Sequence, residues 1–329
     1  MTWPIFVAGG AGILGGGLAL FSGATARKIE KAVPRDGAIM EVDGDRIHYV
    51  DKGGSGPAIV MIHGLGGQMR NFAASMVDDL AKDYRVVLVD RPGSGYSVRA
   101  AGASAHLKVQ AKTMAAFIRK LGLEKPLLVG HSLGGALSLA LAIHHPDVVG
   151  GLALVAPLTQ AQQIEDVPPV FEGLVIRSPA VRRAVSWTIA TPVGMMKAEA
   201  ALREVFAPDP VPENFGVDGG GLLSMRPNNF YASSSDLVDL EHELEPMVAR
   251  YPSLSLPVGI LYGRGDNLLA PALHGEATAS QIPGAEIELV DGGHMLPFTA
   301  PETTAAFVRR VAKRMEQSGE GEDGRRAQG

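Results

Sequence analysis

The sequence predicts an α/β fold with a mostly parallel central sheet, helices on both faces of the sheet and an inserted helical cap. Short apolar runs alternate with helical stretches along most of the chain, which is the pattern of parallel strands joined by helices. Between Pro157 and about Pro257 the alternation stops, and this interval contains helical stretches, prolines and a glycine run but no strand pattern. With 329 residues, 46% of them hydrophobic, the chain can bury one large core or two modest ones.

The core is expected to begin with a hairpin and to continue as strands joined by helices. Residues 38–42 and 46–50 flank Asp43-Gly44-Asp45, a turn sequence typical of hairpins. The strands that follow are expected around Ile59, residues 86–89, Leu127, residues 152–155, Ile260 and Ile287. An amphipathic helix over residues 303–315 is expected to close the core.

This order of elements predicts the domain plan. We expect an α/β core of residues 27–157 and 257–316, a helical cap insertion of residues 158–256, and a disordered polar tail of residues 317–329. A cap in this place sequesters the reaction and sets the shape of the substrate pocket. The apolar cap residues, which predict a hydrophobic acyl or aryl pocket or form the core of the cap, are Val170, Phe171, Leu174, Val175, Ile176, Trp187, Ile189, Phe206, Phe215, Phe230 and Tyr231.

A nucleophile motif lies between an expected strand and an expected helix. Gly130-His131-Ser132-Leu133-Gly134-Gly135 follows an apolar run and matches the spacing G-x-S-x-G. In this motif the serine occupies a strained strand-to-helix turn, and glycines on either side let the neighbouring backbone pass without a Cβ. The helix that follows points the positive end of its dipole at the serine. Ser132 is therefore the predicted nucleophile.

A nucleophilic serine needs a base and an orienting acid, which the motif places later in the chain in the order serine, acid, histidine. Asp266 follows the apolar run that ends at Tyr262, and His294 follows the one that ends at Val290. Both positions are just beyond the carboxyl end of an expected strand, where open α/β sheets build their sites. We predict His294 as the base and Asp266 as the acid. Asp291 is the competing acid, although its position suits a turn better.

The oxyanion hole is expected from two backbone amides. One is the N–H of the residue after the nucleophile, Leu133, and the other comes from the loop after an earlier strand. That loop reads His63-Gly64-Leu65-Gly66-Gly67, and Leu65 is the preferred donor, with Gly66 as the alternative. His63 is interpreted as a brace of this loop rather than as the base, because His294 fits the triad order.

Taken together, these motifs resemble an α/β-hydrolase-fold serine hydrolase of the esterase or lipase type with a helical cap. The resemblance covers about residues 37–315, and it also includes Asp90-Arg91-Pro92-Gly93-Ser94-Gly95-Tyr96-Ser97, which in the family is a structural loop without a catalytic role. Family members that act as dehalogenases or epoxide hydrolases carry aspartate at the nucleophile position. Serine at residue 132 makes those activities unexpected.

The predicted activity is cleavage of carboxylic esters with hydrophobic acyl or aryl groups through an acyl-enzyme on Ser132. The same triad in this family also serves carbon–carbon bond hydrolases, lactonases and perhydrolases, and a low-turnover ligand receptor or scaffold on the same fold is an alternative of another class. No cofactor or metal site is expected. The chain has no cysteine, its adjacent pair His144-His145 lacks helical ligand spacing, and its net charge of −5 gives no basic footprint for nucleic acid.

The N-terminal segment carries a separate signal. Residues 2–26 contain no charged side chain, and about 20 apolar residues are enough to span a bilayer. Because Arg27 and Lys28 follow at once, we expect a membrane anchor that leaves the catalytic domain on the cytoplasmic side. A cleaved export signal and a soluble helix that covers the fold are the alternatives. Since the fold is expected to open near Gly37, residues 2–35 are expected to be dispensable for activity.

Overall fold

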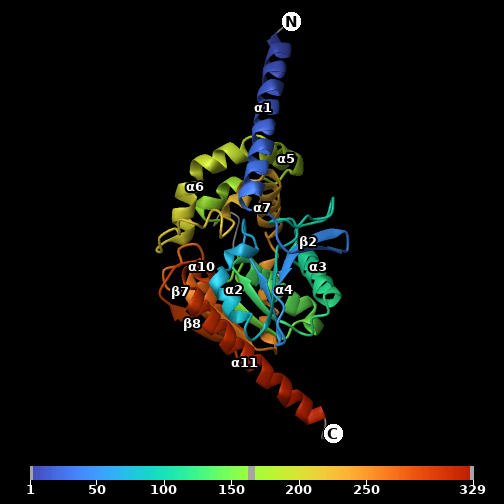
Figure 1. Ribbon diagram of the computed structural model, residues 1–329, viewed down its shortest axis with the longest axis vertical. Coiled ribbons are helices and arrows are strands. Elements are labelled where there is room, and N and C mark those ends of the chain that lie inside the picture. Colours follow the sequence, from blue (N-terminus) through green and yellow to red (C-terminus); the bar gives the residue numbers. More distant parts are fainter. Residues whose placement is uncertain (1–2, 162–166, 327–329) are drawn as a thin grey trace.

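The computed structural model describes residues 3–161 and 167–326, and it confirms the predicted fold class. Among these residues, eight strands form one mostly parallel sheet with helices on both faces, and a group of helices covers one end of it (Figure 1). The strands are β1 (Ala38–Val42), β2 (Asp45–Asp51), β3 (Ala58–Ile62), β4 (Arg85–Val89), β5 (Leu127–His131), β6 (Gly151–Val155), β7 (Val258–Gly263) and β8 (Glu286–Val290).

Helices connect these strands and form the cap. The helices are α1 (Trp3–Ala32), α2 (Ala74–Leu80), α3 (Leu107–Lys120), α4 (Leu133–His144), α5 (Pro179–Trp187), α6 (Ala190–Phe206), α7 (Pro227–Asp239), α8 (Leu244–Val248), α9 (Ala277–Gln281), α10 (Leu296–Thr299) and α11 (Pro301–Arg326), with short 3-10 turns η4 (Pro169–Leu174) and η5 (Gly221–Met225) in the cap.

The strand order is β1-β2-β4-β3-β5-β6-β7-β8. The β1–β2 hairpin turns through Asp43 and Gly44, both with positive φ, and β2 pairs antiparallel with β4. All pairs from β4 onward are parallel, for example Ile62 opposite Gly130 and Gly130 opposite Leu154. The carboxyl ends of β3, β5, β7 and β8 therefore lie along one edge, where loops after parallel strands build sites.

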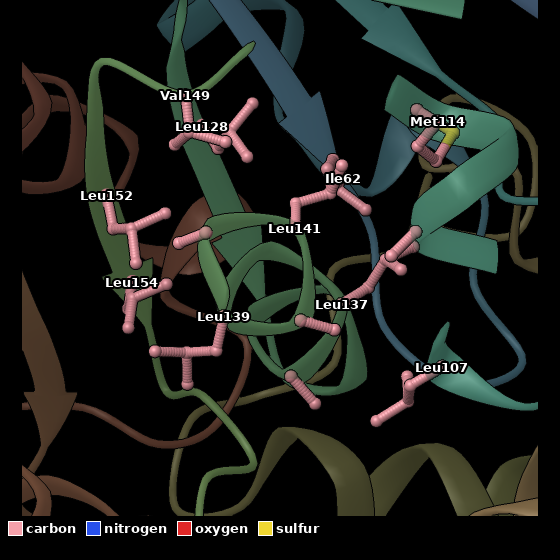
Figure 2. Close-up of a cluster of buried hydrophobic side chains, with 14 of the residues drawn as sticks. Ile62, Leu107, Met114, Leu128, Leu137, Leu139, Leu141, Val149, Leu152 and Leu154 are labelled. Atoms are coloured by element: carbon pink, nitrogen blue, oxygen red, sulfur yellow. The ribbon is translucent and has the colours of Figure 1, made fainter. Parts of the chain in front are cut away.

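Two apolar layers hold the helices to the sheet. Alternate residues of the strands point to opposite faces, so Ile62 joins the layer with α3 and α4, whereas Met61 joins the layer with α2 and α11. Figure 2 shows the first layer, in which leucines of α4 such as Leu137 and Leu141 lie close to Ile62. Burial of these side chains is the main stabilising contribution to the core.

The cap consists of helices, as predicted, and contains no strand within its described residues. Its helices α5, α6 and α7 lie together above the sheet end that carries the candidate site (Figure 1). Not all of the residues expected to form the cap pack as part of it, however. Leu244 and Met247 of α8 are buried in the layer that contains α4, so this part of residues 158–256 packs as core.

Two terminal segments differ from expectation. Helix α11 continues to Arg326, whereas a disordered tail was expected from residue 317. Good helix formers such as Glu316 and Gln317 extend the helix beyond the residues that pack on the sheet. At the other end, no helix among the described residues has both the length and the apolar character needed to cross a membrane, so the predicted anchor is not supported.

The C-terminal part of α1 packs against the folded body instead. Ile29 and Val33 are buried and contact Leu223 of η5. Glu30 pairs with Arg226 at 2.8 Å between Oε1 and Nη1. Removing the last turns of residues 2–35 would expose apolar surface and leave the mostly buried Arg226 without this carboxylate. That these residues are dispensable for activity stays a prediction.

Candidate active site

Ser132 occupies the turn between β5 and α4, as the motif requires. Its backbone has φ 55° and ψ −122°, a strained conformation for a residue with a Cβ. The surrounding glycines explain how this turn is accommodated. A Cβ on Gly64 would lie 2.9 Å from the Ser132 Cβ, and a Cβ on Gly130 would lie 2.6 Å from the Gly134 carbonyl oxygen. The turn is held between neighbouring backbones that approach too closely for any larger residue.

Replacing Gly134 with alanine should damage both stability and activity. A Cβ there would lie 2.0 Å from the Ile62 carbonyl oxygen and 2.6 Å from that of His63, so the end of β3 would have to move. We expect Gly134→Ala to lower the free energy of unfolding by about 3 kcal/mol and to reduce turnover more than tenfold. Thermal melts and ester turnover provide the measurements. Gly194→Ala is the matched control: nothing lies within 4 Å of that position in α6, so it should not destabilise.

His294 and Asp266 lie in contact. Nδ1 of His294 is 2.7 Å from Oδ2 of Asp266, and both residues are buried. The other carboxylate oxygen, Oδ1, accepts hydrogen bonds from the amides of Leu268 and Leu269 at 2.9 and 3.0 Å. Burial would raise the pKa of Asp266, but the charge and hydrogen bond of His294 and these two amides together lower it. Asp266 is therefore a carboxylate that can hold the imidazole in one orientation, and it contacts His294 where Asp291 does not.

One apolar pocket contains the predicted nucleophile, the base and both predicted oxyanion donors. Leu133 is the first residue of α4, so its N–H has no intrahelical acceptor. Leu65 belongs to the loop after β3 and lines the same pocket. The residues that line the pocket are Leu65, Ser132, Leu133, Leu158, Val167, Pro168, Phe171, Leu237, Leu240, Leu268, Leu269 and His294.

The structure separates the two roles that the sequence left open for the apolar cap residues. Of the apolar cap residues named from the sequence, only Phe171 is among those that line this pocket. Phe206 and Phe215 instead pack edge to face with ring centroids 4.7 Å apart, and they form a separate apolar cluster of the cap. Trp187 and Ile189 are exposed. Leu237 and Leu240, near the end of α7, take part in the pocket instead.

His63 braces the loop that contains Leu65. Its Nε2 accepts the Arg91 amide at 3.0 Å, and its Nδ1 lies 2.9 Å from the Gly64 carbonyl oxygen. Burial and the charge of Arg91 lower the pKa of His63 to about 4, so its ring is neutral at pH 7. These contacts agree with the interpretation of His63 as a structural residue.

Arg91 has a role that the sequence did not reveal. Its buried guanidinium donates from Nε to the His63 carbonyl at 3.0 Å and from Nη2 to the Gly64 carbonyl at 3.1 Å. Nη1 also pairs with Asp236 of α7 at 2.8 Å. Arg91 thereby ties the loop with the predicted oxyanion donor to the cap. The ion pair joins residues 145 positions apart, and no local pattern signals such a contact.

His131 supports the predicted base from the other side. Its ring centroid lies 4.9 Å from that of His294, and its Nε2 is 3.0 Å from the His294 carbonyl oxygen. Burial and the neighbouring His294 lower the pKa of His131 to about 3. A neutral ring that donates to this carbonyl fixes the backbone of His294. No group of three His, Asp or Glu side chains suited to a metal ion occurs in the described part of the chain.

The buried neutral histidines predict acid sensitivity. Burial lowers the pKa of His63 and His274 to about 4 and that of His131 to about 3, from an ordinary 6.5. Below pH 6.5 the unfolded chain gains protons at these rings while the folded chain does not, so the free energy of unfolding falls as the pH falls. We expect a loss of about 2 kcal/mol for each ring at pH 5, measured by thermal melts between pH 7 and pH 5.

One histidine works in the opposite direction. Burial lowers the pKa of His48, but the hydrogen bond and charge of Asp90 outweigh this and raise it overall, so His48 offsets part of the loss. The three neutral rings should still dominate. A melting temperature that stays constant or rises between pH 7 and pH 5 would contradict their buried neutral state.

Comparisons with known proteins agree with this fold. Residues 57–301 match the family described as the alpha/beta hydrolase fold. An acetyltransferase component of the acetoin cleaving system of Cupriavidus necator is 30% identical over 82% of this chain and 67% of its own. A 2-hydroxy-6-oxononadienedioate hydrolase of Burkholderia vietnamiensis is 35% identical over 39% of this chain and 46% of its own. A thermophilic esterase from Thermogutta terrifontis superposes with a TM-score of 0.69 at 21% identity, covering 84% of this chain and 99% of its own.

The fold and the site thus define an α/β protein with a strained turn, which carries Ser132, at one edge of a mostly parallel sheet. The chain belongs to the alpha/beta hydrolase fold family, and proteins named as hydrolases are among its relatives.

Proposed function

We propose that the protein is a serine hydrolase that cleaves carboxylic esters of hydrophobic acyl or aryl groups. One observation carries the proposal: Ser132, on its strained turn, shares an apolar pocket with His294, whose Nδ1 is bound to a buried carboxylate. A serine, a histidine and an orienting acid in this arrangement are the requirements for acyl transfer.

The proposed reaction proceeds in two halves. His294 accepts the proton of the Ser132 hydroxyl through Nε2 as Oγ attacks the ester carbonyl carbon, and the amides of Leu65 and Leu133 stabilise the oxyanion. Collapse of this intermediate breaks the ester bond, and the alcohol leaves with the proton from His294. Water then attacks the acyl-enzyme with His294 again as base, which releases the acid and restores Ser132.

Two measurements test the proposal. A fluorophosphonate probe should label Ser132, and p-nitrophenyl esters of increasing acyl length should show a preference for apolar chains, because the pocket walls are mostly leucine. A vinylogous diketone and a lactone serve as competing substrates. Faster turnover of either would assign the site to carbon–carbon bond or lactone hydrolysis. Labelling without turnover of any substrate would favour the ligand receptor.

A further inference from the structure

Large apolar side chains are exposed mainly on one part of the molecule. Of the 13 exposed large hydrophobic residues among the described side chains, nine lie on α1, α5, α6 or the link between α5 and α6. Met196 is 85% exposed and Leu20 is 76% exposed, so most of each side chain lies outside the core of the protein. The nine residues are Leu14, Leu20, Phe21, Val181, Trp187, Ile189, Val193, Met195 and Met196, and we call them the cap–α1 surface.

The helices that carry this surface are packed together. Helix α1 contacts both α5 and α6, and the Ser22 hydroxyl donates to the Thr188 carbonyl oxygen at 3.3 Å. In Figure 1, α1 leaves the body of the protein beside α5 and α6, at the end opposite the C-terminus of α11. The exposed apolar residues thus gather at one end of the molecule, and gathered exposed apolar residues mark interaction sites.

The charges around this surface are cationic. Residues 2–26 and 184–196 carry no charged side chain, and the charged residues that follow or precede these segments are Arg27, Lys28, Arg183 and Lys197. No carboxylate lies at ion-pair distance from these four among the described side chains, while the nearby Glu30 is paired with Arg226. The apolar surface is therefore bordered mainly by positive charge, and the exposed Glu199 that follows on α6 is paired with Arg203.

The exposed apolar residues and the cations around them together distinguish between the partners that could bind this surface. In a two-fold contact between two copies of the chain, the cations of one copy would lie close to the same cations of the other. Repulsion between these like charges opposes such a dimer. An anionic lipid surface matches both features, because it accepts apolar side chains below the headgroups and attracts cations at the headgroup level. Trp187 suits the boundary between the two regions, where tryptophan is enriched.

We propose that the cap–α1 surface docks on a lipid bilayer that contains anionic phospholipids, with the protein lying on the bilayer. The proposal does not depend on the activity of the site, because it rests on exposed side chains outside the candidate pocket. It requires only that the exposed apolar residues enter the headgroup region and that the four cations remain beside it.

Flotation of the full chain with phospholipid vesicles tests this interface. We expect binding to phosphatidylcholine vesicles that contain phosphatidylglycerol and weaker binding to pure phosphatidylcholine. The variant Leu20→Gln/Phe21→Gln/Met196→Gln should lower the partition coefficient by at least about tenfold. Lys28→Gln/Lys197→Gln should lower it by about fivefold for each cation on anionic vesicles only. Val109→Gln/Leu273→Gln, which changes exposed residues outside this surface, should bind as the wild type does.

Circular dichroism melts establish that each variant is folded, so that lost binding reports on the surface. Absence of wild-type flotation, or equal binding of all variants, would overturn the proposal. So would a lipid-free dimer, detected by light scattering, that the glutamine variants dissociate, since the surface would then join two copies. Carbonate washing should release the bound protein, and protein retained after carbonate would contradict docking at the surface.

Discussion

Ser132→Ala should abolish ester turnover while leaving the fold intact. The substitution removes one hydroxyl from a turn whose Cβ is retained, so the strained backbone and the close glycine contacts are unchanged. In serine hydrolases the loss of the nucleophile lowers kcat by about 10⁴ to 10⁶. We therefore expect turnover of a p-nitrophenyl ester to fall to the background rate, fluorophosphonate labelling to disappear and the melting temperature to change little.

Ser280→Ala is the matched control, because that hydroxyl is exposed and contacts only the Ala277 carbonyl of its own helix. It should keep wild-type turnover and labelling. Retention of more than a few per cent of wild-type activity by Ser132→Ala would show that another residue is the nucleophile. An unfolded Ser132→Ala protein would show instead that the hydroxyl supports the turn.

Local patterns were sufficient to predict the fold class. Alternating apolar runs and helices specify a parallel sheet, because each buried strand needs apolar residues on both faces and each crossover needs a helix. The strained turn at Ser132 could also be predicted from its motif, since backbone contacts within the motif and with neighbouring strands require glycine at residues 130 and 134. The sequence also suggested that His63 braces a loop, which its contacts with Arg91 and Gly64 support.

Features that depend on distant contacts were not predictable. An uncharged apolar segment is compatible with a bilayer and with packing on protein. The packing of α1 on the body depends on distant contacts, such as those of Ser22 with Thr188 and of Ile29 and Val33 with Leu223. The same ambiguity affects the cap, where Phe171 lines the pocket but Phe206 fills the cap interior. An apolar residue in the sequence indicates that its side chain will be buried, but it does not indicate which part of the protein will cover it.

Asp266→Asn should lower kcat by about 10⁴ with little change in stability. The Oδ1 atom of Asp266 accepts two backbone amides, from Leu268 and Leu269. In the asparagine variant the carbonyl oxygen must take this position, because an NH₂ group cannot accept those hydrogen bonds. The NH₂ group then faces Nδ1 of His294 and donates to it. This places the ring proton on Nε2, the atom that must accept the proton of Ser132.

Asp291→Asn separates this effect from a general loss of negative charge near the site, since Asp291 lies three residues before His294 without being its hydrogen-bond partner. It should keep turnover within about tenfold of wild type, whereas Asp266→Asn should keep its affinity for substrate and lose kcat. Equal losses in both variants would assign the role to net charge, and a larger loss in Asp291→Asn would make that residue the acid. The larger loss of kcat expected for Asp266→Asn follows from the tautomer of His294 that the asparagine fixes, because a neutral imidazole can accept the serine proton only at the nitrogen that carries none.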